Sequence, residues 1–126
     1  MTEQNIENIE ISKYDGLLAM HSLLDQCVVS KCNEDFLSFI RLMAPTLVSD
    51  WKMGKHIGVL ADKLQKVKEG KIKRLMVFLP PRSSKSVICS KLFPAWYIGN
   101  NPEHEILTIS HSDQLSSDFG RSVRDI

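Results

Sequence analysis

The sequence predicts an α/β fold with a parallel sheet, preceded by a helical N-terminal extension. Two short apolar runs, residues 73–79 and Glu105–Ser110, have the composition of buried strands. A short polar joint and a segment of helical period follow each run. Strand, helix, strand and helix with short joints favour parallel pairing. Because two strands do not make a stable sheet, we expect these 126 residues to be the front part of a larger domain.

The helices are expected from apolar residues at helical spacing and from capping residues. Residues 1–12 are polar, and we expect them to be disordered or loosely docked. Asn33 is the expected cap of a second helix that Pro45 ends, Gly70 should close a third, and Pro94 should kink or split a fourth. Ser110 or Ser112 should cap the last. The expected helices cover residues 14–29, 33–44, 55–69, 85–98 and 113–126.

The composition is that of an ordinary globular protein, with 43% hydrophobic and 25% charged residues. The net charge is only +1, but residues 51–91 contain eleven basic and two acidic side chains. This basic segment would favour anions; a solvated lysine-rich helix is the alternative for Lys63, Lys66 and Lys68. The acidic start is not a secretory signal, and no apolar run approaches the length of a membrane span. Three cysteines without metal-ligand spacing indicate a reducing compartment, so we predict a cytoplasmic protein.

The first apolar run ends in a turn with the layout of a phosphate-binding loop. Residues 80–86 read Pro-Pro-Arg-Ser-Ser-Lys-Ser, and a helical pattern follows. In such a loop backbone N–H groups face the phosphates, the lysine reaches the β- and γ-phosphates, and the hydroxyl holds Mg²⁺. Lys85 and Ser86 would take these roles in a P-loop NTPase-type parallel sheet, incomplete in this chain. Leu79 and Ser84 replace the two glycines of the usual motif, and a solvated surface turn remains the alternative.

Three separated blocks of the sequence form a recognisable pattern. They are Lys71–Ser86, Phe93–Pro102 (Phe-Pro-Ala-Trp-Tyr-Ile-Gly-Asn-Asn-Pro) and Ile109–Asp125, which ends in Asp-Phe-Gly-Arg-Ser-Val-Arg-Asp. In order and spacing, over roughly residues 33–126, they resemble the large terminase subunit of tailed bacteriophages. Ser84 is a departure, since most relatives have glycine there. The resemblance divides the chain into an N-terminal polar segment and helix, 1–32, and the front part of an ATPase domain, 33–126.

The resemblance implies a motor that hydrolyses ATP, with Mg²⁺, to drive double-stranded DNA into a procapsid. A separate nuclease domain would cut concatemers, and the Walker B and nuclease carboxylates would lie beyond Ile126, so this chain alone should be inactive. Implied partners are the portal protein, the small terminase subunit and further copies in a ring, without a membrane, in the cytoplasm of a bacterial host and transiently on the procapsid.

The resemblance also assigns roles within the loop. Arg82 would act in cis on the γ-phosphate, Lys85 would bind the β/γ-phosphates, and Ser86 would hold Mg²⁺. Pro81, Ser83 and Ser84 would lie close to the phosphates, with backbone amides offered by the two serines. Two other readings stay open: another P-loop ATPase such as a helicase, and a non-catalytic prophage remnant.

Other residues admit a functional and a structural reading. Trp51 and His56 stand where relatives often carry an aromatic residue and a histidine near the adenine; a packing residue and an exposed histidine are the alternatives. Phe93, Trp96 and Tyr97 could stack on bases, but helical spacing favours core packing beneath the sheet. Residues 110–113, Ser-His-Ser-Asp, could suggest a hydrolase triad, but helix capping is simpler. Arg121 and Arg124 could contact DNA phosphates, a neighbouring subunit or solvent.

Overall fold

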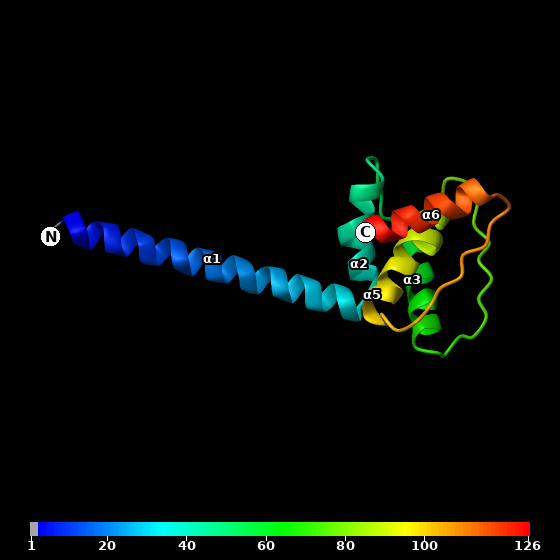
Figure 1. Cartoon of the computed structure of the whole chain (residues 1–126), viewed down its shortest axis with the longest axis horizontal. Helices are drawn as coiled ribbons and strands as arrows, with labels where there is room; N and C mark the ends of the chain where they lie inside the picture. Colours follow the sequence, from blue (N-terminus) through cyan, green and yellow to red (C-terminus); the bar gives the residue numbers. More distant parts are fainter. Residues whose placement is uncertain (1–2) are drawn as a thin grey trace. The chain divides into compact units, whose positions relative to one another are not determined.

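The computed structural model describes residues 3–126, with side chains from Leu18 onward. The chain divides into two compact units, Met1–Lys31 and Cys32–Ile126. The helices in chain order are α1 (Glu3–Glu34), α2 (Phe36–Leu47), α3 (Lys55–Lys68), α4 (Lys85–Val87), the π-helical turn η1 (Ile88–Leu92), α5 (Phe93–Asn100) and α6 (Asp113–Asp125). Figure 1 labels the longer ones.

Helix α1 begins earlier than the sequence suggested. Residues 1–12 were expected to be disordered or loosely docked, but the helix starts at Glu3; residues 1 and 2 lie outside the described part. Large apolar side chains of its described stretch, including Leu18, Leu23 and Val29, are more than half exposed. In the part of the chain that the structure describes, no helix combines the length and the apolar character needed to cross a membrane.

Helix α2 is capped by Asp35 rather than by the predicted Asn33. The Asp35 carboxylate accepts a hydrogen bond from the Ser38 backbone N–H at 2.8 Å, whereas Asn33 still belongs to α1. Pro45 lies inside α2 and does not end it. The helix continues because the Val48 N–H still reaches the Ala44 carbonyl at 3.0 Å, so the proline removes only its own donor from the last turn.

Helix α3 matches the predicted third helix closely. Its apolar residues recur at i, i+3, i+4 and i+7 and are buried: Ile57, Leu60, Ala61 and Leu64. Gly70 follows with a φ of 73°, the left-handed conformation that glycine adopts without steric cost after a helix. The prediction that Gly70 closes this helix is confirmed.

A continuous helical run over Lys85–Asn100 contains a π-helical turn immediately before Pro94. The Phe93 N–H bonds to the Ile88 carbonyl, five residues back, instead of the usual four. In a regular helix the Pro94 ring would clash with the carbonyl of Ser90, so the wider turn accommodates the proline. Ile88, Leu92 and Trp96, at spacings of four, form the buried face of the run.

The second unit has one core, made by α2, α3 and the helical run. The Trp96 ring is 2% exposed, and its Nε1–H donates to the Cys32 carbonyl at 2.7 Å. Phe36 packs against it with ring centroids 4.9 Å apart. The core residues are Phe36, Ile40, Ala44, Ile57, Leu60, Ala61, Leu64, Ile88, Leu92 and Trp96. These contacts fix the helical run, and with it the end of the candidate phosphate loop, residues 80–86.

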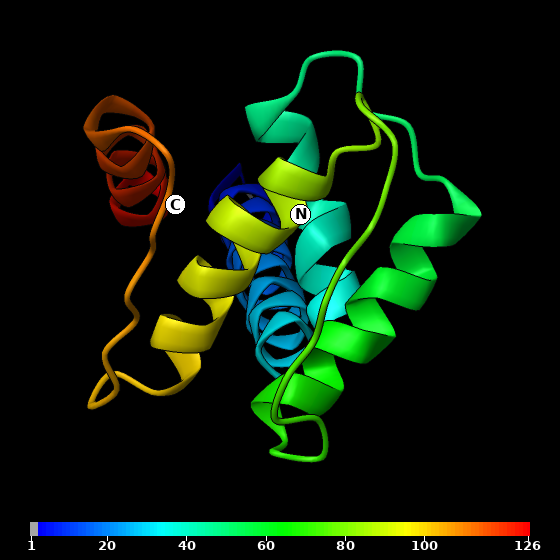
Figure 2. The same ribbon diagram turned by 90° about the vertical axis from the view of Figure 1, so that its right-hand side faces the viewer.

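The predicted α/β class, with its P-loop NTPase-type parallel sheet, is wrong for this structure. Residues 3–126 contain helices and no strand. Residues 75–79 do alternate, with Leu75, Val77 and Leu79 packed on the core and Met76 and Phe78 about 80% exposed. Figure 2 shows this segment and residues 105–109 apart from each other, and the cavities beside both segments are lined by Cys89 and Ser90 of the helical run. Neither segment has the hydrogen-bonded neighbour that a strand requires.

Helix α6 begins where the sequence predicted. Ser112 is its cap, and its hydroxyl accepts a hydrogen bond from the Leu115 N–H at 3.4 Å. Asp113 stands in the first turn, where the helix dipole favours an acidic side chain. Capping thus accounts for two members of the Ser-His-Ser-Asp run.

Candidate phosphate-binding loop

The candidate phosphate loop connects residues 74–79 to the helical run. Pro80 and Pro81 begin it, and the Ser83 hydroxyl donates to the Pro80 carbonyl at 2.7 Å. This bond spans three residues and closes the turn upon itself. The first helical bond beyond the turn runs from the Ile88 N–H to the Ser84 carbonyl at 3.0 Å. The N–H groups of residues 85–87 therefore precede any helical hydrogen bond, as the first donors of a helix do.

Two loop residues hold backbone conformations that glycine normally supplies. Arg82 has a φ of 61° and Ser84 a φ of 60°, and no other non-glycine residue among the described residues has a positive φ. Such a conformation disfavours a residue with a Cβ by about 1–2 kcal/mol. Ser84 occupies the second glycine position of the usual motif, so the backbone keeps the geometry of the motif although the glycine is lost.

A left-handed residue followed by a helical one turns successive N–H groups toward a common point. Ser84, with φ 60° and ψ 13°, precedes Lys85, the first residue of α4. Concavities of this kind bind anions through their backbone N–H groups. The loop geometry is thus suited to a phosphate before any side chain is considered.

The structure brings the predicted loop residues around one cavity of about 390 Å³. Lys85 is half-buried, whereas Arg82 and Ser86 are exposed. A lysine, an arginine and a hydroxyl on one cavity supply positive charge and a metal-binding oxygen, which suits a phosphate group with Mg²⁺. The cavity is lined by Leu79, Pro80, Pro81, Arg82, Ser83, Ser84, Lys85, Ser86 and Val87.

Lys85 and Ser86 also line a neighbouring cavity of about 410 Å³, together with Val77 and Cys89. Burial raises the pKa of the Cys89 thiol, and the positive charge of Lys85 partly opposes this. The thiol therefore stays protonated near neutral pH, and Cys89 serves as a small apolar wall beside the lysine.

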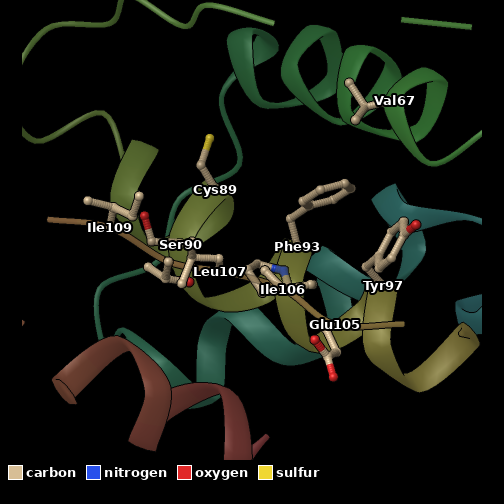
Figure 3. A pocket seen from close by; sticks show the side chains of 11 residues that line it. Val67, Cys89, Ser90, Phe93, Tyr97, Glu105, Ile106, Leu107 and Ile109 are labelled. Atoms are coloured by element: carbon tan, nitrogen blue, oxygen red, sulfur yellow. The ribbon is translucent and has the colours of Figure 1, made fainter. Parts of the chain in front are cut away.

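The largest of these cavities, about 540 Å³, lies on the other side of Cys89 and has a different character. Figure 3 shows Phe93 and Tyr97 from the helical run beside Ile106, Leu107 and Glu105. The lining includes Glu105 and no lysine or arginine. Because it offers no positive side chain for a phosphate, the largest volume of the three does not identify the phosphate site.

His56 was interpreted either as a residue near an adenine or as an exposed histidine, and in the structure it contacts the candidate phosphate loop. Its Nε2 lies 3.3 Å from the Ser83 carbonyl oxygen, and its side chain is exposed. Trp51 is half-buried and packs against the core, which supports its structural reading. The contact between His56 and Ser83 joins positions 27 apart, and no motif in the sequence indicates it.

The remaining candidates mostly take structural roles. Trp96 is in the core, and Phe93 and Tyr97 are half-buried with tilted ring contacts, although no sheet covers them. The Ser110 hydroxyl bonds to the Ser112 carbonyl and to the Ser116 hydroxyl instead of to a histidine.

The two arginines of α6 face acidic neighbours, and no metal site accompanies them. Arg121 lies 3.7 Å from Asp118 and Arg124 3.4 Å from Asp125, both on the surface. Among the residues whose side chains are described, no group of three His, Cys, Asp or Glu could hold a metal ion. A metal at the candidate phosphate loop would therefore depend on Ser86 and on the phosphates that accompany it.

Comparison with known proteins adds no relative to this picture: no protein-family model, curated protein or solved structure matches the chain.

Proposed function

We propose that residues 80–86 bind the phosphates of ATP together with Mg²⁺, and that the chain is the ATP-binding part of a viral DNA-packaging motor of the large-terminase type. The observation that carries the proposal is the pair of left-handed residues, Arg82 and Ser84, immediately before Lys85 and Ser86. Strained backbone of this kind persists where the surroundings hold it and is concentrated at binding sites. The proposal rests on this loop and not on a sheet.

Each loop residue has a defined part in the proposed site. The Lys85 ammonium binds the β- and γ-phosphates, and the Ser86 hydroxyl holds Mg²⁺. Backbone N–H groups of residues 82–86 add uncharged donors, and the Arg82 guanidinium stabilises negative charge on the γ-phosphate. Pro81 has no N–H and instead limits the backbone freedom of the turn.

Binding of Mg²⁺·ATP to the Lys85→Ala variant tests the nucleotide part. Isothermal titration should show the affinity falling by tenfold or more, since a charged hydrogen bond contributes about 1.5–3 kcal/mol. Lys91→Ala is the matched control, because it removes the same charge from the same helical run outside the loop cavity. Equal affinity in Lys85→Ala and the parent would exclude the phosphate-binding assignment.

The motor part is supported by the ordered blocks Phe93–Pro102 and Ile109–Asp125. It is tested on the native gene product isolated from its source. ATP hydrolysis stimulated by double-stranded DNA, without strand separation, is expected for a packaging motor. Unwinding of a forked duplex would instead indicate a helicase. ATP binding without hydrolysis in the native product would indicate a non-catalytic remnant.

A further inference from the structure

His56 connects the start of α3 to the middle of the candidate phosphate loop. The Ser83 carbonyl can only accept, so the Nε2 atom 3.3 Å away must carry the proton and donate. The same serine is held from its other end, where its hydroxyl donates to the Pro80 carbonyl. Ser83 is thus fixed by two hydrogen bonds of different origin, one from within the loop and one from α3.

The imidazole is itself held against Gly54, the residue before α3. A Cβ on Gly54 would lie 2.6 Å from Cε1 and 2.7 Å from Nδ1 of His56, well inside contact distance. The φ of Gly54 is −94°, which any residue adopts, so its backbone does not require glycine. What requires glycine is the space that the His56 ring occupies.

The hydrogen bond from His56 to the Ser83 carbonyl also sets the direction of the next backbone N–H group, that of Ser84. The Ser83 carbonyl and the Ser84 N–H belong to one planar trans peptide and point in opposite directions. A donor that fixes the carbonyl toward His56 therefore fixes the Ser84 N–H away from it. This peptide leads directly into the left-handed Ser84, the conformation that most needs external support.

We propose that His56 is a positioning residue for the candidate phosphate loop: clamped between Gly54 and the Ser83 carbonyl, it orients the Ser84 N–H for a phosphate. This inference rests on the proposed function, because the oriented N–H is assigned to phosphate binding. His56 acts through the loop and does not itself touch the ligand.

Three variants of the full chain separate the hydrogen bond from the bulk of the ring. His56→Phe keeps a ring over Gly54 and removes the donor, and His56→Gln restores an N–H donor without the ring. Gly54→Ala displaces the ring and leaves both His56 and the loop chemically unchanged. The two His56 variants should fold because His56 is exposed, and Gly54→Ala should fold because its φ suits alanine and the exposed ring can move. Thermal unfolding checks all three.

The affinity for Mg²⁺·ATP and the amide resonance of Ser84 are expected to change together. The affinity for Mg²⁺·ATP should fall about five- to tenfold in His56→Phe and Gly54→Ala, the effect of losing one hydrogen bond, and stay within about twofold in His56→Gln. In the nucleotide-free protein, the amide ¹H–¹⁵N resonance of Ser84 should shift in His56→Phe and return toward its parent position in His56→Gln. A change in general stability would give neither the rescue nor a shift confined to the loop.

The outcomes distinguish the two proposals. Parent-like affinity and an unmoved Ser84 resonance in His56→Phe, with Lys85→Ala still impaired, would overturn the role of His56 alone. A parent protein that does not bind Mg²⁺·ATP would overturn the proposed function, and the phosphate role of His56 with it. In that case the Ser84 resonance still reports whether His56 holds the loop.

Discussion

At the residue scale, Ser84 allows a direct test of the loop conformation, because glycine would hold the same φ of 60° without a steric cost. Ser84→Gly should raise the free energy of unfolding by about 0.5–1 kcal/mol. Relief of the left-handed strain, about 1–2 kcal/mol, exceeds the added entropy of glycine in the unfolded chain, about 0.4–1 kcal/mol. Chemical denaturation measures the difference.

The control for this substitution stands two residues further on. Ser86 is helical, so Ser86→Gly should lower the unfolding free energy by about 0.5–1 kcal/mol. Opposite signs at positions 84 and 86 are the expected result. A destabilising effect at both would mean that Ser84 is not left-handed in solution.

The sequence predicted the candidate loop better than it predicted the partner of that loop. Residues 80–86 are consecutive, so a local pattern could identify them and could place Ser84 where a positive φ is needed. The contact of His56 with the Ser83 carbonyl depends on how α3 packs, and packing across 27 positions leaves no local signal.

At the scale of elements, periodicity located the helices, while their ends depended on individual hydrogen bonds. Helix α3 and the cap at Ser112 agree with prediction because apolar spacing and capping residues are local properties. The two strands were wrong for a different reason. Residues 75–79 alternate as a strand would, but a ladder needs a neighbouring backbone that composition cannot reveal.

The start of α2 gives a prediction at this scale. Asp35→Ala should lower the free energy of unfolding by about 1 kcal/mol, because the Ser38 N–H loses its acceptor at 2.8 Å. Asp35→Asn is the matched control, since its amide oxygen can still accept and should retain most of the stability. Urea denaturation monitored by circular dichroism distinguishes them. Equal losses in both variants would indicate that charge, and not capping, is what Asp35 contributes.

At the scale of the whole second unit, stability resides in the packing of helices. Trp96, Phe36 and Ile88 are all at most 2% exposed, and they come from α2 and the helical run. Residues 75–79 pack only one face on this core, and Phe78 on the other face is 82% exposed. Residues 105–109 add no side chain to the core, and Leu107 is 85% exposed. The loss of folding stability that a substitution causes should therefore depend on whether the side chain faces the core or the solvent.

Side chains along residues 75–79 alternate between the core and the solvent, so neighbouring positions can test this difference in stability. Phe78→Glu should change the unfolding free energy by less than about 0.5 kcal/mol, because the side chain is already in water. Val77→Glu, the matched inward change, should cost about 2 kcal/mol or more, since a carboxylate would enter the edge of the core. Trp96→Ala sets the upper limit at about 3–5 kcal/mol. Guanidinium titrations rank the three. A large loss in Phe78→Glu would show that the outward face is covered in solution, and the segment would then stabilise the molecule through contacts beyond the helical core.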